Sequence, residues 1–227
     1  MTKSKVLHIQ PISRRNRLSL MLLGGALLIV CFVIDLLFWQ QYKIQLILIN
    51  MAALIVFLVG YLKHIQPHNS YTLMPEHLQY HHPWGQWRLP WQDIQRLGLV
   101  HTDIQLQRIE LPYIGIKLHN LDALAKSISP RLANKLVHEQ KQLLVLAIKR
   151  GDITFQDGII CFDPFVLNQN AIKGPVAAFL HQCCVLQRAY GYHLFLPKDS
   201  FDRSEDEFLS LLKQCHYHAI NTYQRNP

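Results

Sequence analysis

Histidine and cysteine are the residues of this chain best able to bind a metal ion or take part in catalysis. The 227 residues include 13 histidines and 5 cysteines. The densest groups are His77, His81 and His82, and Cys215, His216 and His218. Metal sites need paired ligand spacings on a helix or turn, such as i and i+4 or Cys-x-x-Cys. His77 and His81 have that interval, but across a predicted turn and strand. We therefore interpret these histidines as surface and strand residues rather than as metal ligands.

The cysteines do not follow a disulfide pattern. They are Cys31, Cys161, Cys183, Cys184 and Cys215. An odd count at irregular spacing indicates reduced, buried thiols in a cytosolic domain. The chain has no nucleophile elbow and no glycine-rich phosphate loop. The sequence therefore predicts no catalytic residue, no metal site and no cofactor.

Three tryptophans lie near one predicted turn, and two arginines follow closely. The residues are Trp84, Trp87, Arg88, Trp91 and Arg96. Two interpretations stay open. The indoles pack in the core and around the turn, or they form a contact site for the membrane interface or a partner, together with the arginines.

Two apolar stretches precede these residues, and they determine where the rest of the chain lies relative to a membrane. Residues 18–39 contain a single charge, Asp35, and residues 44–61 contain none. At about 1.5 Å per residue they form helices of about 33 and 27 Å, close to the ~30 Å of a bilayer core. The first run is too long for the core of a cleaved signal peptide. The sequence predicts a transmembrane hairpin over residues 18–63, with a tight turn at 40–43.

Asp35 and Asn50 are polar exceptions inside the hairpin. An ion or proton site is one interpretation, because ionisable groups within a membrane are costly and often functional. We favour a structural role, in which Asp35 reaches water or pairs with Lys43, and Asn50 cross-links the helices by a hydrogen bond. Gly24 and Gly25 would allow close helix approach.

The distribution of charge predicts the orientation of this hairpin. The chain has a net charge of +8, and the arm at residues 1–17 carries five basic residues and no acid. Cytoplasmic segments of membrane proteins are enriched in Lys and Arg, so both termini should be cytoplasmic. Residues 62–227 have 17 Lys and Arg against 14 Asp and Glu, a net charge of +3. This small excess does not indicate nucleic-acid binding.

The rest of the chain reads as one α+β domain, residues 71–227, after a linker at 64–70. Short apolar runs with Pro and Gly between them predict an antiparallel meander, and helical spacings follow. We predict strands at 71–74, 78–82, 86–89, 91–100, 104–109 and 113–118. A short helix then starts at Asn120 or Asp122 and runs through Ser127, and further helices cover 130–150 and 175–191. We also predict a strand hairpin at 153–155 and 159–162, a strand at 192–196, and a helix from Ser204 that frays after Asn221.

Local motifs add a resemblance to known proteins. Tyr71–Val100 resembles the opening of bacterial PH-like membrane proteins, with Pro-Glu-x-Leu at Pro75–Leu78 and Leu-Pro-Trp-x-Asp-Ile at Leu89–Ile94. Leu111–Asn120 and Ser127–Leu136 are similar to a narrower family of uncharacterised bacterial inner-membrane proteins, a domain of unknown function. The resemblance implies a PH-like antiparallel barrel or sheet with additional helices and a C-terminal helix, and it carries no catalytic residues.

These observations lead to one expected function and one alternative. We expect a multi-pass protein of the bacterial inner membrane, integral to the lipid bilayer, that presents its domain in the cytoplasm as a non-enzymatic interaction or assembly module. Its partner would be another protein or a second copy, with no nucleic acid involved. The alternative is a membrane-associated enzyme or metal-binding protein that uses the histidine-rich surface.

Overall fold

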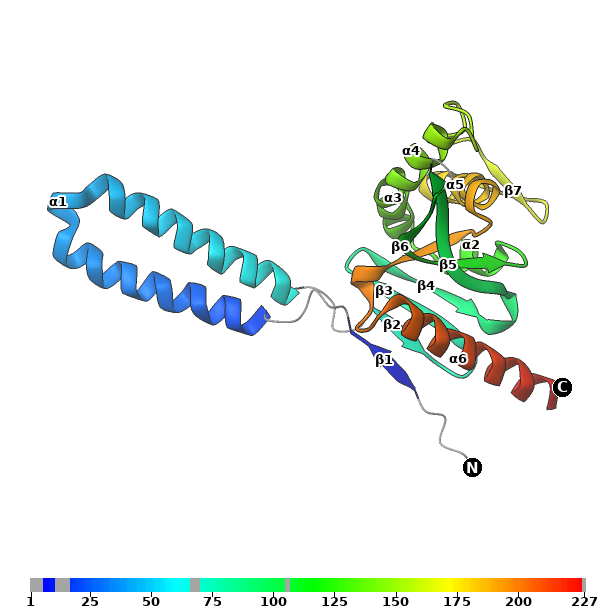
Figure 1. Ribbon diagram of the computed structural model, residues 1–227, viewed down its shortest axis with the longest axis horizontal. Coiled ribbons are helices and arrows are strands. Elements are labelled where there is room, and N and C mark those ends of the chain that lie inside the picture. Colours follow the sequence, from blue (N-terminus) through cyan, green and yellow to red (C-terminus); the bar gives the residue numbers. More distant parts are fainter. Residues whose placement is uncertain (1–5, 11–16, 66–69, 105–106, 226–227) are drawn as a thin grey trace. The chain divides into compact units, whose positions relative to one another are not determined.

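The computed structural model describes residues 6–10, 17–65, 70–104 and 107–225. The chain divides into two compact units (Figure 1). One unit is the apolar hairpin, Ile12–His68. The other is a domain built from Met1–Pro11 together with Asn69–Pro227. The chain therefore leaves the domain, forms the hairpin and returns to the same domain.

The hairpin is a pair of helices within α1 (Arg17–Ile65), interrupted at Tyr42, whose backbone is not helical (φ −129°, ψ 36°). Met21–Phe38 and Tyr42–Leu62 are long and apolar enough to cross a membrane. Only 11% and 17% of the residues in these two stretches are buried. A core helix of a soluble protein would be mostly buried, so the exposure argues against that alternative. The predicted pair of apolar helices is confirmed.

Gly24 sets the contact between the two helices. A Cβ atom at this position would lie 2.6 Å from the Cα atom of Phe57, so only glycine fits without a shift of the backbone. At Gly25 an added Cβ would meet nothing within 4 Å. The close approach expected from the two glycines is therefore provided by Gly24 alone.

The first sheet contains a strand from the N-terminal arm. Its order is β1 (Leu7–Ile9), β2 (Tyr71–Leu73), β3 (His77–His82) and β4 (Gly85–Pro90), all antiparallel. The sequence predicted residues 1–17 as a separate basic arm. That boundary is wrong for Leu7–Ile9, because these residues pair with β2; most of the remaining arm lies outside the described residues. A strand of three residues is too short to show an alternation of apolar and polar side chains. It can be identified only from its pairing with β2.

A second sheet has the order β5 (Ile94–Ile104), β6 (Gln107–Leu118) and β9 (Leu194–Pro197). A single turn of 3-10 helix, Trp91–Asp93, precedes β5. The sequence predicted three shorter strands where β5 and β6 form one long hairpin, with register shifts between Ile94 and Arg96 and between Leu99 and His101. The helices α2 to α5 lie in the chain between β6 and its partner β9.

The helices follow the predicted order with two corrections. They are α2 (Asp122–Ser127), α3 (Pro130–Glu139), α4 (Lys141–Arg150), α5 (Pro175–Tyr190) and α6 (Glu205–Arg225). The single helix predicted over 130–150 is broken at Gln140, whose ψ of 3° leaves the helical range. The helix that begins after Ser204 continues beyond Asn221, where fraying was predicted. The Ser204 hydroxyl accepts a hydrogen bond from the Glu207 N–H (3.3 Å), which confirms the predicted cap.

The strand hairpin predicted at 153–162 is wrong. The third sheet is instead β7 (Phe165–Leu167) paired with β8 (Asn170–Ile172), joined by Asn168 and Gln169, which both have positive φ (46° and 65°). Two successive residues with positive φ make the tight turn that matches strand twist. Side-chain hydrogen bonds within 154–157 compete with strand pairing there.

The sheets and helices enclose a main core and a smaller one. The largest buried side chains of the main core are Trp91, Tyr71, Phe179, Phe201 and Phe208. In Figure 1, α3, α4 and α5 gather at one end of the domain, and α6 lies at the other. The α+β class is confirmed. Among the described residues the strands form three separate sheets, so the expected PH-like barrel is not closed.

The close contact at Gly24 yields a prediction for the hairpin. Gly24→Ala should lower the thermal stability of α1, because the added methyl forces the two backbones apart, a kind of overpacking that costs about 1–3 kcal/mol. Gly25→Ala is the matched control and should leave stability unchanged or slightly higher. Thermal melts of the full chain in detergent micelles, followed by circular dichroism, compare the two. Equal melting temperatures for both variants would contradict the packing.

Candidate functional site

The connection between α4 and α5 presents large apolar side chains to the outside. Phe155, Ile159, Phe162 and Val166 have exposed fractions of 73%, 59%, 59% and 70%. We call Phe155–Val166 the apolar segment. Exposed apolar residues are ordinary when scattered, but several within twelve consecutive residues are unusual. The segment is therefore the strongest candidate surface of the domain.

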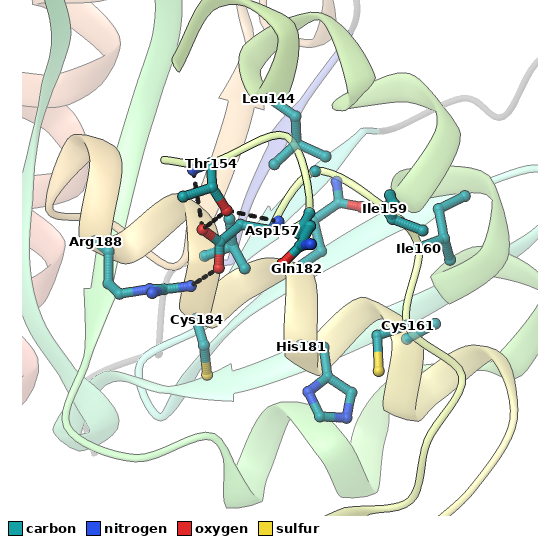
Figure 2. A pocket seen from close by; sticks show the side chains of 14 residues that line it. Leu144, Thr154, Asp157, Ile159, Ile160, Cys161, His181, Gln182, Cys184 and Arg188 are labelled. Carbon is teal, nitrogen blue, oxygen red and sulfur yellow. Dashed lines mark hydrogen bonds and ion pairs between the residues drawn. The ribbon is translucent and has the colours of Figure 1, made fainter. Parts of the chain in front are cut away.

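Polar contacts hold the beginning of this segment in place. The Asp157 carboxylate accepts hydrogen bonds from the Thr154 hydroxyl (2.6 Å), the Thr154 N–H (3.0 Å) and the Arg188 guanidinium (2.7 Å). Figure 2 shows these bonds converging on Asp157 from the loop and from α5. They lower the pKa of Asp157 to about 2, with the Thr154 hydroxyl contributing most, then the Thr154 N–H, then Arg188. Asp157 therefore stays ionised and ties the loop to α5.

Further contacts fix the rest of the segment. The Asp163 carbonyl accepts a hydrogen bond from Nε2 of His181 (3.2 Å), and the Phe165 ring meets the His181 ring edge-on at 5.0 Å. The Asn168 amide donates to the Asp122 carboxylate on α2 (2.6 Å). These hydrogen bonds hold the segment to α2 and α5, while Phe155, Ile159, Phe162 and Val166 stay exposed.

A cavity of about 430 Å³ lies between this loop and helices α4 and α5. Its apolar lining includes Leu144, Ile160 and Val185, and its polar lining includes His181 and Gln182 (Figure 2). Two thiols, Cys161 and Cys184, also line it.

Three thiols of the domain are poorly suited to act as nucleophiles. Burial raises the pKa of Cys183, Cys184 and Cys215. These side chains therefore remain protonated at neutral pH, whereas the reactive form of cysteine is the thiolate. All five cysteines are free in the structure.

The histidines do not converge on a metal site in the part of the chain that the structure describes. No three His, Cys, Asp or Glu side chains there are arranged to hold a metal ion. His81 contacts Thr72, whereas His82 lies 3.9 Å from the Glu139 carboxylate, since neighbouring residues of a strand point to opposite faces. His216 contacts the Ile94 carbonyl (3.0 Å).

The tryptophan and arginine group predicted as a contact site is divided by the fold. Trp87 and Trp91 are buried, with 2% and 1% exposed, and the Trp91 indole donates to the Met74 carbonyl (2.8 Å). Trp84 is 55% exposed in the turn between β3 and β4. Arg88 is exposed on β4. Arg96 lies on β5, in the other sheet, with its guanidinium over the Tyr192 ring. The three indoles therefore do not share one surface, because strand alternation turns Trp87 inward.

Asp35 and Asn50 meet between the helices of the hairpin. The Asn50 amide donates to Asp35 Oδ2 (2.8 Å) and to the Leu46 carbonyl (2.9 Å). The predicted cross-link by Asn50 is confirmed, and it joins Asp35 rather than leaving that residue to pair with Lys43. The other carboxylate oxygen of Asp35 is buried without a partner among the described residues.

The sequence pattern does not predict the apolar segment, because its closely spaced apolar residues also fit short strands. A usable indication was present. Asp157-Gly158 and Asp163-Pro164 mark turns, so the large apolar side chains beside them belong to a loop. Loops normally lack such side chains, and their presence indicates a surface with a role.

The bonds to Asp157 give a test of how the loop is held. Thr154→Val should raise the Asp157 pKa from about 2 towards its ordinary value, because it removes the largest contribution. Arg188→Gln should raise it less. The stabilisation from a lowered carboxyl pKa is present at neutral pH and is lost as the pH falls through that pKa. A carboxyl ¹³C NMR titration of the full chain measures both variants; an unchanged pKa in Thr154→Val would show that the loop is not held this way.

Comparison with known proteins gives a family but no characterised relative. No curated protein and no solved structure matches the chain. Residues 71–218 match the family described as Protein of unknown function (DUF2982). The match covers more than half of the chain and includes the apolar segment, its cavity and most of α6. The chain therefore belongs to the DUF2982 family.

Proposed function

We propose that this protein is a membrane-anchored, non-enzymatic interaction module of the bacterial inner membrane, and that its apolar segment binds a partner protein. The hairpin is the anchor in this proposal. The domain carries the recognition surface on the cytoplasmic side. The observation that carries the proposal is the group of exposed apolar side chains on a loop that hydrogen bonds of Asp157, His181 and Asn168 hold in place.

The topology of the chain supports the anchor. β1 precedes the hairpin and β2 follows it, and these two strands pair directly. A hairpin of two crossings returns the chain to the side where it started, as this pairing requires. The basic residues of the arm favour the cytoplasm for that side.

The apolar segment supports a protein as the partner. Exposed apolar patches on folded domains commonly mark protein interaction sites, and aromatic residues are enriched at the centres of such sites. Phe155 and Phe162 supply two aromatic anchors. Because Asp157, His181 and Asn168 already fix the backbone, little ordering entropy would be lost on binding.

Photo-crosslinking in native membranes tests the partner surface. A photoreactive amino acid at Phe155 or Phe162 should give the same discrete protein adduct. The control is the same probe at Tyr217, which is similarly exposed (67%) but lies on α6. Adducts that appear equally from Tyr217, or that contain only lipid, would contradict the proposal.

Substitution of the anchors supplies the second arm of this test. Phe155→Ser with Phe162→Ser should lower the yield of the adduct formed from a probe at Val166 by about tenfold or more, as expected for hot-spot residues. The melting temperature should stay near that of the unsubstituted chain, because both side chains are exposed. A normal adduct yield in the double variant would show that the aromatics do not contribute.

The orientation of the anchor has a separate test. A reporter enzyme that is active only outside the cytoplasm, fused after Pro227, should show no activity. The reason is that two crossings and a cytoplasmic arm place the C-terminus in the cytoplasm. A reporter that is active only in the cytoplasm, fused at the same place, is the control. Activity of the first reporter would reverse the proposed orientation.

A further inference from the structure

The four-stranded sheet has one apolar and one polar face. Side chains alternate along each strand, so every second residue turns away from the core. The register places four polar residues in one row across all four strands: His8 on β1, Thr72 on β2, Gln79 on β3 and Arg88 on β4. By the same alternation, His77, His81 and Gln86 share this face. We call these side chains the polar face.

The polar face is held together by side-chain hydrogen bonds. Thr72 Oγ1 lies 3.0 Å from His81 Nε2 and 3.4 Å from His8 Nδ1, and the Gln79 amide donates to Gln86 (2.7 Å). Thr72 and Gln79 are only 3% and 5% exposed, because their neighbours cover them. Gln86, Arg88 and His8 stay exposed around them. The face is therefore an ordered surface with its charged groups at the rim.

The charge of this face has one sign. None of its side chains is acidic, and Arg88 is a permanent cation. Nε2 of His77 is buried without a hydrogen-bond partner among the described residues. Such a surface, rich in donors and free of carboxylates, complements phosphate groups.

The strands that carry the face also connect it to the hairpin. Ile9 pairs with Tyr71, and β2 begins six residues after α1 ends at Ile65. That length of chain spans at most about 20 Å. A hairpin embedded in a bilayer therefore keeps the start of β2 within that distance of the helix end.

We propose that the polar face docks on the anionic phosphate headgroups of the bilayer in which the hairpin is anchored. The proposal rests on that anchoring and is independent of the partner surface at the apolar segment. Arg88 supplies the permanent charge, and His81 adds positive charge when it is protonated. Each basic residue near an anionic surface strengthens such binding about fivefold.

Acidity should strengthen this docking. Burial lowers the pKa of His81, and Arg88 and His8 lower it further, so His81 is mostly neutral at pH 7. Bound phosphate would favour the protonated form, and binding must then increase as the pH falls. Among the described residues, Arg88 and His8 are the charged or titratable groups that face His81 from the neighbouring strands, with Thr72 between.

Histidine modification of the full chain in lipid nanodiscs tests the proposal. Nanodiscs of phosphatidylcholine are compared with nanodiscs that also contain phosphatidylglycerol, and diethylpyrocarbonate modification of each histidine is followed by mass spectrometry. His8 and His81 should react several-fold more slowly with the anionic lipid present. His138, exposed on α3, is the internal control and should not change. Co-elution of the chain with both kinds of disc reports the anchoring separately.

Variants and salt identify the cause of protection. Arg88→Gln should reduce the protection about fivefold, whereas Arg131→Gln, which removes an exposed charge on α3, should leave it intact. Salt at ~1 M, where the Debye length is about 3 Å, should abolish the protection.

Three results would overturn the proposal. They are equal modification rates in both discs, protection that includes His138, and full protection in neutral discs on addition of inorganic phosphate. The last result would assign the face to soluble phosphate instead of the bilayer. None of these results affects the photo-crosslinking test at Phe162, which examines the proposed partner surface separately.

Discussion

The pairing of Leu7–Ile9 with Tyr71–Leu73 is the contact on which the rest of the structure depends. It joins two segments separated by the whole hairpin, residues 10–70. Closing a flexible loop of that length costs about 3–4 kcal/mol in chain entropy. The antiparallel packing of α1 offsets this cost, because it already brings both ends of the hairpin to the same side. The close contact at Gly24 and the hydrogen bond between Asn50 and Asp35 hold the two helices together. They thereby favour the pairing of β1 with β2, although they lie outside that sheet.

The same sheet shows how its edge strands are protected. On β4, the Ser127 hydroxyl bonds both the N–H and the carbonyl of Arg88 (3.1 and 2.8 Å), and Ser129 bonds the Trp84 carbonyl (3.1 Å). Side chains from the α2–α3 turn thus occupy groups that a further strand would otherwise take. At the other end of the domain, polar contacts fix a loop whose apolar side chains remain exposed. Two surfaces of opposite chemistry therefore lie on one rigid scaffold.

The sequence predicted elements whose pattern is local. The hairpin, the strands of the first meander, α2, α5 and the cap at Ser204 were found because periodicity, Pro, Gly and capping residues act over a few positions. The errors fall where distant contacts compete. Asp157 bonds Thr154 and Arg188, so residues 153–162 form a loop and not a hairpin. Gln140 leaves the helical range between two helices that the apolar spacing alone would join.

The sequence by itself determined that this chain has two helices able to cross a membrane, followed by an α+β domain. Long apolar runs and short stretches of alternating apolar and polar residues can be seen in the order of the residues alone. Only the tertiary structure decided that the N-terminal arm supplies a strand, that Trp87 and Trp91 are buried, and that Phe155 and Phe162 are exposed. The physical reason is that burial is a property of packing between segments far apart in the chain. An indole or a phenyl ring has the same affinity for the core in every sequence, and the fold determines which of them reach it.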